Sequence, residues 1–156
     1  MKTTLLVVGK TVGAELCALI EMYRSRVCHY MPFEIRVLPD LKNTKNLSES
    51  QIKEEEGELI LRAAGNSMVI LLDERGEEYR SMAFARQLES WLQRPVSGLT
   101  FVIGGSYGFS EAVYKRADAQ LSLSRMTFSH QMIRLLFVEQ LYRAQTILRG
   151  EPYHHE

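Results

Sequence analysis

Side chains that can transfer protons, bind anions or stack on flat rings cluster in the last third of the chain. They are His130, Arg134, Glu139, Gln140 and Arg143, followed by the tail Tyr153-His154. Histidine exchanges a proton near neutral pH, arginine can hold a phosphate, and tyrosine can stack on an unpaired nucleobase. The first five interrupt an apolar helical pattern, where each buried polar group needs a partner. They could form an internal hydrogen-bond network, but their number beside a Ser/Thr-rich loop favours a functional site.

A second candidate is the segment Gly104-Gly-Ser-Tyr-Gly108, which fits the G-x-S-x-G pattern of a nucleophile elbow. Asp118 and His130 follow it in the order of a Ser–Asp–His triad. A small serine hydrolase that uses Ser106 is therefore an alternative function. It is the weaker one, because the chain is shorter than that fold normally requires and has no HGGG-type oxyanion segment.

Length and composition indicate one folded domain, residues 1–156, in which 46% of the residues are hydrophobic and can form a buried core. The formal net charge is zero, which argues against tight binding to naked DNA but permits a structured RNA partner. Cys17 and Cys28 lack the spacing of metal ligands and suit a reducing cytoplasm. The apolar run near the start is too short for a signal peptide or membrane span, so we expect a soluble cytoplasmic protein.

The elements that must position these residues alternate between short apolar runs and longer amphipathic segments. The apolar runs predict strands at Thr3–Val8, Phe33–Leu38, Met68–Leu72, Leu99–Ile103 and Leu121–Leu123. Helices are predicted at Val12–Tyr30, from the capping box Ser48/Gln51 onward, at Ser81–Gln93, after Ser110 and at Phe128–Leu148. This order predicts an α/β fold with a mostly parallel sheet covered by helices on both faces.

The loops beyond the carboxyl ends of these strands are the expected ligand site, as in other parallel α/β sheets. Three predicted loops leave those ends: a turn at 73–76, the glycine pair Gly104-Gly105 and the segment 124–128. Glycine lets the backbone approach a ligand closely. The acidic run between Glu49 and Glu58, in contrast, is expected to be a solvated helix face.

The last predicted helix is apolar around much of its circumference. Ile133 and Phe137 point away from Leu135 and Leu136 at helical spacing. Such a helix suits burial on both sides, which favours contact with a second subunit. The alternative is a central core helix in a monomer.

Motifs that follow one another along nearly the whole chain carry a family resemblance. They are Val8-Gly-Lys10, Glu56-Gly57, Leu72-Asp73 with Gly76, Phe101-Val-Ile-Gly-Gly-Ser-Tyr-Gly108, Leu121-Ser-Leu-Ser-Arg-Met-Thr127, His130-Gln131 with Arg134, Glu139-Gln-Leu-Tyr-Arg-Ala144 and Gly150-Glu-Pro-Tyr-His154. In this order they resemble the bacterial rRNA large-subunit methyltransferase H family of the SPOUT (α/β-knot) class. Two features depart from the family pattern: Ser129 stands in place of a proline, and the segment after Gly76 lacks a lysine and a Ser-Ser-Glu.

The resemblance implies methyl transfer from S-adenosylmethionine to ring nitrogen 3 of a pseudouridine in 23S rRNA, on the assembled 70S ribosome. It also implies a C-terminal trefoil knot and a homodimer with the site at its interface. The implied cofactor-binding residues are Leu72, Gly104, Leu123, Ser124, Arg125, Met126, Thr127 and Phe128. The candidate catalytic residues are His130, Arg134, Tyr153 and His154. The general base stays open between the histidines and the cofactor carboxylate, and a non-catalytic ribosome-binding module is a third functional class.

Overall fold

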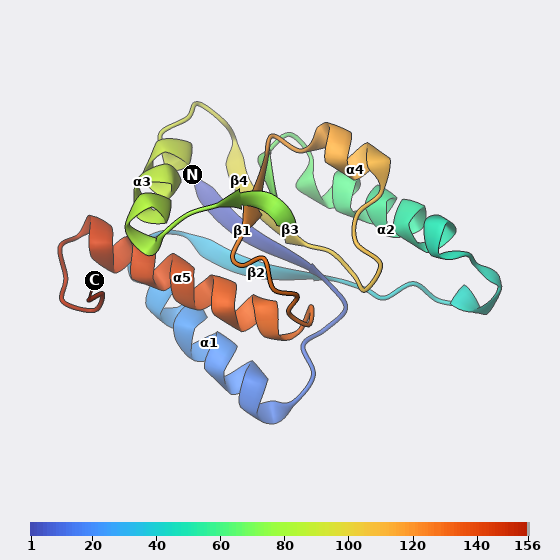
Figure 1. Ribbon diagram of the computed structural model, residues 1–156, viewed down its shortest axis with the longest axis horizontal. Coiled ribbons are helices and arrows are strands. Elements are labelled where there is room, and N and C mark those ends of the chain that lie inside the picture. The colour runs from blue at the N-terminus through green and yellow to red at the C-terminus, as the bar shows by residue number, and fades with distance from the viewer. Residues whose placement is uncertain (156) are drawn as a thin grey trace.

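A five-stranded parallel sheet forms the centre of the computed structural model, which describes residues 1–155 (Figure 1). Glu156, the last residue of the predicted domain, lies outside the described residues. The strands are β1 (Lys2–Val8), β2 (Phe33–Leu38), β3 (Met68–Glu78), β4 (Gly98–Ile103) and β5 (Ala119–Ser122). Their order across the sheet is β2-β1-β4-β3-β5, and the described pairings are all parallel. The predicted α/β fold class is confirmed.

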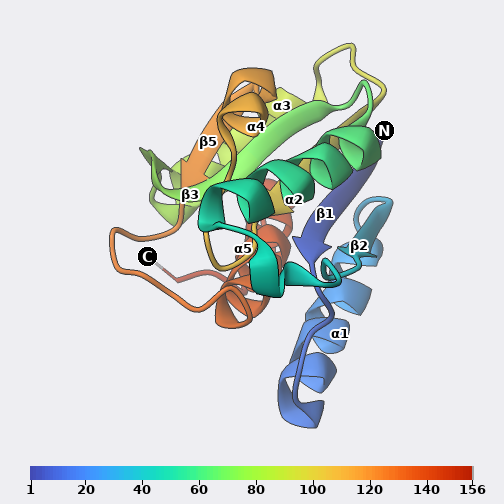
Figure 2. The same ribbon diagram turned by 90° about the vertical axis from the view of Figure 1, so that its right-hand side faces the viewer.

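Helices cover both faces of this sheet. They are α1 (Ala14–Cys28), α2 (Glu49–Ala64), α3 (Ser81–Leu92), α4 (Glu111–Arg116) and α5 (Met132–Leu148), with a short 3-10 helix η1 (Thr44–Asn46) before α2. Helices α1, α3 and α5 lie on one face, and α2 and α4 lie on the other (Figure 2). Within residues 1–155, no helix combines the length and the apolarity that a membrane crossing requires.

Two apolar cores follow from the alternation of side chains along the strands. In β1, Leu5 and Val7 point into the core shared with α1, α3 and α5, whereas Leu6 and Val8 point into the core shared with α2 and α4. Because both faces of β1 are covered, its residues Leu5–Val8 are apolar without interruption, as expected for a buried parallel strand. Phe137 belongs to the first core, where its ring centroid lies 4.7 Å from that of Phe101.

The predicted turn at 73–76 is wrong, because β3 continues to Glu78. Its pairing with β5 shifts register there: Leu72 and Glu77 both face Leu121, so the intervening residues bulge out of the ladder. A Cβ at Gly76 would lie 2.7 Å from backbone atoms of Gln120 and Leu121. Gly76 is therefore needed for close approach of two strands rather than for a turn.

Helix α5 begins at Met132, four residues after the predicted start at Phe128. The Met132 N–H donates a hydrogen bond to Ser129 Oγ (3.1 Å), so the serine that replaces the family proline satisfies an amide at the helix start. The segment between β5 and α5 is consequently a loop that carries most of the predicted pocket residues. The predicted starts of α2 and α4 are confirmed, since Ser48 and Ser110 both accept backbone N–H groups.

Candidate functional site

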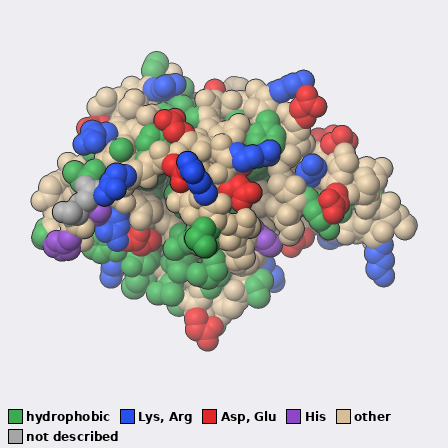
Figure 3. Space-filling view, in the orientation of Figure 1, with side chains coloured by type: hydrophobic (Ala, Val, Ile, Leu, Met, Phe, Trp, Pro, Cys, Tyr) green, Lys and Arg blue, Asp and Glu red, His purple; other side chains and the backbone are tan. Residues whose placement is uncertain are grey.

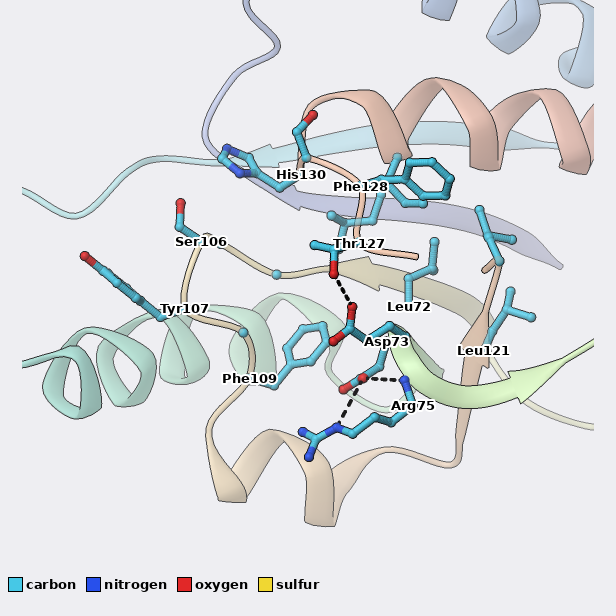
Figure 4. Close-up of a pocket in the computed structure, with 18 of the residues that line it drawn as sticks. Leu72, Asp73, Arg75, Ser106, Tyr107, Phe109, Leu121, Thr127, Phe128 and His130 are labelled. Atoms are coloured by element: carbon cyan, nitrogen blue, oxygen red, sulfur yellow. Dashed lines mark hydrogen bonds and ion pairs between the residues drawn. The ribbon is translucent and has the colours of Figure 1, made fainter. Parts of the chain in front are cut away.

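A cavity of about 710 Å³ opens at the carboxyl ends of β3, β4 and β5 (Figure 4). The three segments that were expected to bind a ligand all contribute to it: the residues after Leu72, the glycine-rich loop 104–108 and the loop 123–130. The predicted pocket residues that line it are Leu72, Gly104, Leu123, Ser124, Met126, Thr127 and Phe128. Arg125 is not among the lining residues; its Nε donates to the Glu78 carboxylate (2.7 Å) outside the cavity.

Apolar side chains from four elements form the inner walls of this cavity. They are Leu72, Ile103, Phe109, Leu121, Leu123 and Ile133. Backbone groups of the loops lie between them and supply donors and acceptors. A cleft that combines apolar walls with polar groups is suited to a small organic ligand such as a nucleoside, which has both a flat ring and polar edges.

The loop 123–130 is tied to the extended end of β3 by two polar contacts. Thr127 Oγ1 donates to Glu74 (2.8 Å), and Arg125 pairs with Glu78. These contacts are exposed, and exposed pairs contribute at most about 1 kcal/mol each. The loop can therefore adjust around a ligand at little energetic cost.

A compact polar group lies at the side of the cavity formed by β3. The Tyr114 hydroxyl donates a short hydrogen bond to Asp73. The other Asp73 oxygen accepts the Arg75 N–H (2.9 Å) (Figure 4). Burial and then the bond to Asp73 raise the pKa of Tyr114, so this hydroxyl keeps its proton at neutral pH. Asp73 was expected in a turn, and nothing in the sequence indicated its pairing with Tyr114.

The carboxylate of Glu56 on α2 packs against the backbone of the glycine-rich loop. Both Glu56 oxygens approach Gly105 so closely that a Cβ at Gly105 would lie 2.7 Å from each. Glu56 is only 9% exposed, so the expected solvated face is wrong for this residue, although Glu49, Glu54, Glu55 and Glu58 are exposed. Burial, followed by the charge of Asp40, raises the pKa of Glu56, and a hydrogen bond from the Gly105 backbone opposes that rise.

Gly57 is the residue in the local sequence that indicates the burial of Glu56. A Cβ at Gly57 would lie 2.5 Å from Ser110 Oγ, so glycine lets α2 pack closely against the start of α4. The close approach brings the neighbouring Glu56 under the loop that precedes α4. The motif Glu56-Gly57 in the sequence thus marks a buried contact with the glycine-rich loop.

Arg134 joins the start of α5 to the end of β1. Its guanidinium donates to the carbonyl oxygens of Val8 (2.8 Å), Gly9 (2.8 Å) and His130 (3.0 Å), and to Thr11 Oγ1 (3.1 Å). The side chain is 1% exposed, and burial lowers its pKa. In this conformation Arg134 positions the loop that carries His130, and its donors face the protein's own backbone.

The other polar residues of α5 have partners within the chain. Glu139 accepts hydrogen bonds from Arg143 (2.5 Å) and from the Tyr153 hydroxyl (3.0 Å). Gln140 accepts from Ser81 (3.0 Å), and Arg143 Nη1 lies 3.1 Å from His154 Nδ1. Of the five polar groups in the helical pattern, His130 is the one that lines the cavity. The polar residues within α5 thus form the internal network that was one of the two expectations, and His130, which precedes α5, lines the cavity.

The arrangement of a serine hydrolase does not form. Ser106 and His130 both line the cavity, but Asp118 lies at the opposite end of the sheet. There the Asp118 carboxylate accepts the Val69 N–H (2.8 Å) at the start of β3 and pairs with Arg116. A triad requires the acid to orient the histidine, and Asp118 cannot reach it.

Comparison with known proteins places this geometry in a family. Residues 1–154 match the family described as predicted SPOUT methyltransferase. The chain belongs to the SPOUT methyltransferase family. A protein of Parabacteroides distasonis named "Ribosomal RNA large subunit methyltransferase H" is 57% identical over 100% of both chains, and one of the same name from Christiangramia forsetii is 56% identical over 99% of both. The resemblance carried by the motifs is thereby confirmed.

Solved structures share the SPOUT fold at low sequence identity. The tRNA (m1G37) methyltransferase of Aquifex aeolicus has a TM-score of 0.57 and 14% identity, covering 100% of this chain and 76% of that one. A probable methyltransferase from Bordetella pertussis has a TM-score of 0.54 and 8% identity, covering 92% and 94%. At these identities the likeness concerns the fold alone.

Within one chain of this SPOUT methyltransferase, the predicted catalytic residues fall into two groups. His130 lines the cavity and Arg134 lies directly behind it, at the start of α5. Tyr153 and His154 follow α5 and fold back along it, where the Tyr153 hydroxyl donates to Glu139 (3.0 Å) and its ring packs edge-on against Tyr142 with centroids 4.7 Å apart. Neither residue lines the cavity of its own chain.

Proposed function

We propose that this protein transfers a methyl group from S-adenosylmethionine to ring nitrogen 3 of a pseudouridine in 23S rRNA, on the assembled 70S ribosome. The name of the relatives with 50–57% identity supports an rRNA substrate and a methyl transfer. The observation that carries the proposal is the cavity itself, which is lined by seven of the eight residues implied for the cofactor. A cytoplasmic location follows if the substrate is the bacterial ribosome.

The lining residues fit a nucleoside-containing cofactor. A volume of about 710 Å³ lies in the range of small-molecule sites, and the apolar walls can enclose a purine. Leu72, Leu123 and Phe128 would pack on the adenine, while the backbone of Ser124–Phe128 reads its polar edge. When bound, the cofactor supplies a methyl group on a positively charged sulfur. The protein then has to align that methyl group with the target nitrogen and exclude water.

The proton on the target nitrogen must also leave. The imidazole of His130 lines the cavity and is one candidate acceptor for this proton. His154 is a second candidate; it does not line the cavity of its own chain, and its Nδ1 lies 3.1 Å from Arg143 Nη1. In the proposed assembly, a second copy of the chain brings its tail to this cavity. Three groups can therefore act as the general base: His130, His154 and the carboxylate of the cofactor. Whether His154 takes part depends on dimer formation.

We further propose a homodimer in which the tail of each subunit covers the cavity of its partner. Helix α5 packs between α1 and α3, and Phe137 is fully buried, so the apolar circumference of α5 is largely explained within one chain. A better indication is the hydrophobic surface over α1 and the start of α5 (Figure 3). Its exposed side chains include Leu19, Met22 and Met132. A patch shared by neighbouring helices suits a self-complementary interface.

Three measurements separate the functional classes. Purified protein with labelled S-adenosylmethionine should transfer label to 23S rRNA of 70S ribosomes that lack the modification, and mass spectrometry should locate it on nitrogen 3. Absence of label in 23S rRNA would refute the proposal. A hydrolase would instead react at Ser106 with a fluorophosphonate, and a ribosome-binding module would bind ribosomes without taking up S-adenosylmethionine in calorimetry. The implied trefoil knot is tested by tracing the chain in an experimental structure.

A further inference from the structure

The two aromatic side chains that are most exposed both lie at the cavity. Tyr107 is 46% exposed and Phe128 is 41% exposed, and both line the cavity described above. Every other Phe, Tyr and Trp within residues 1–155 is buried or half-buried. Water-exposed aromatic surface is unfavourable, so its concentration at one opening indicates ligands that cover it. Phe128 is part of the implied cofactor pocket, whereas Tyr107 has no assigned role.

Tyr107 is presented by a constrained turn. The Gly108 N–H donates to the Gly105 carbonyl (3.1 Å), and Gly108 has a φ of 83°, which favours glycine. Gly105 in turn lies against the buried carboxylate of Glu56. The ring therefore projects from a loop that is fixed at both ends, which lowers the entropy lost when a partner binds it.

The surroundings of Tyr107 favour one kind of partner. Ser106, Tyr107 and His130 lie on one side of the cavity, and Asp73 and Arg75 lie on the other, with Phe109 between them (Figure 4). Lys53 of α2 lines the same cavity and contributes a positive charge. A flat ring and a cation that line one cavity match a nucleotide that has left its stack, because the ring can stack on the base and the cation can attract the phosphate.

We propose that Tyr107 is the stacking platform for an unpaired nucleotide of the RNA substrate, and that Lys53 contacts the phosphate beside it. This inference rests on the proposed function and deepens it by naming residues that bind the acceptor rather than the cofactor. The target nitrogen lies inside the edge of a base, so the base must be turned out to enter a cavity of this kind. An aromatic side chain at the mouth compensates part of the stacking lost in that step.

The test uses full-length protein and 70S ribosomes lacking the modification. Tyr107→Ala should raise KM for ribosomes by about 10-fold or more, the scale of one stacked base, and weaken ribosome binding in sedimentation to the same degree. Tyr107→Phe and Tyr107→Trp should retain binding within about 3-fold, because stacking requires the ring and not the hydroxyl. The calorimetric Kd for S-adenosylmethionine should stay unchanged in all three. Lys53→Met should raise KM and reduce its dependence on salt.

Val37 on the edge strand β2 offers a matched control, since it is equally exposed and lies outside the cavity. Val37→Ala should behave as wild type. The inference is overturned if Tyr107→Ala keeps the wild-type KM, if Tyr107→Phe is as defective as Tyr107→Ala, or if cofactor affinity falls in parallel. Tyr107 could instead contact the second subunit. Light scattering tests this alternative, because a weakened dimer in Tyr107→Ala would overturn the inference and assign the ring to a subunit contact. Wild-type protein that fails to methylate ribosomes would instead refute the proposed function.

Discussion

The buried carboxylate of Glu56 lies directly beneath the backbone of Gly105. The contact joins α2 to the loop that forms one wall of the cavity. Position 105 must be glycine because any larger residue would place its Cβ against the Glu56 oxygens. The requirement does not come from the backbone conformation, since Gly105 has no positive φ. The contact also fixes the position of the loop that carries Ser106 and Tyr107.

Gly105→Ala should therefore displace the loop and weaken cofactor binding. The added Cβ would lie 2.7 Å from both Glu56 oxygens, and overpacking of this kind typically costs about 1–3 kcal/mol. We expect the Kd for S-adenosylmethionine in calorimetry to rise by roughly 10-fold. The double variant Gly105→Ala/Glu56→Ala removes the clashing oxygens and should recover part of the affinity. If it binds as weakly as the single variant, the clash is not the cause.

The raised pKa of Glu56 predicts how its contribution to stability varies with pH. A carboxyl whose pKa is higher in the folded than in the unfolded state stabilises the fold most at pH values below the unfolded pKa, and this stability is lost as the pH rises through the folded pKa. Glutamine keeps an acceptor for the Gly105 N–H and cannot ionise. The stability of Glu56→Gln relative to wild type should thus be greater at pH 8 than at pH 5.

Urea unfolding of both proteins at the two pH values measures this difference, and other titrating groups cancel in the comparison. The exposed neighbour Glu55 provides the control, because Glu55→Gln should shift stability equally at both pH values. An equal effect of Glu56→Gln at pH 5 and pH 8 would show that Glu56 ionises as freely as a surface carboxyl.

The strands and the loops of the site could be predicted from the sequence, whereas the burial of Glu56 could not. The strands could be predicted because uninterrupted apolar runs such as Leu5–Val8 are required wherever both faces of a sheet are covered. The three loops could be predicted because parallel strands bring their carboxyl ends to one edge. Glu56 looks like any acid of a charged helix, and its burial depends on Gly57, Ser110 and Gly105, which only the tertiary structure brings together.

The two errors in element boundaries have a similar origin. Asp73–Gly76 has the composition of a turn, yet β5 pairs on both sides of it and keeps the chain extended through a bulge. Phe128 continues the apolar spacing of α5, but Ser129 binds the Met132 amide and starts the helix later. In both places a long-range pairing or a capping side chain outweighs the local pattern.

Arg134→Met should destabilise the protein strongly. The substitution removes the donor from two buried carbonyl oxygens, at Val8 and Gly9, and from a part-buried one at His130. Each unsatisfied buried group costs about 1–3 kcal/mol, so we expect a loss of about 3 kcal/mol or more in urea unfolding. Arg134→Lys should recover little, because an ammonium cannot reach the same oxygens in the geometry of the guanidinium fork. Arg94→Met removes the same charge at an exposed position and should leave stability nearly unchanged; a similar loss there would point to a general effect of charge.

The final prediction concerns the tail. Removing residues 153–156 should lower methylation by at least about 100-fold, the scale of a lost general base or positioning contact, while cofactor binding persists. The described part of the tail packs on Tyr142, Arg143 and Glu139 of its own α5, so the truncated protein should also be somewhat less stable. Stability and cofactor affinity must therefore be measured together with activity.

A mixing experiment then decides whether the tail acts on the partner's cavity. The truncated chain has an intact cavity, and Gly105→Ala has an intact tail. With S-adenosylmethionine held well below the wild-type Kd, the Gly105→Ala homodimer should work at roughly a tenth of the wild-type rate and the truncated homodimer at about a hundredth or less. If each site combines the cavity of one subunit with the tail of the other, a mixed dimer regains one complete site. Equal mixing after unfolding and refolding should then restore roughly a quarter of the wild-type rate, since half of the dimers are mixed and each has one working site. Because a mixed dimer in which each tail served its own cavity would contain no complete site, a mixture as inactive as its components would place the tail's action within one subunit.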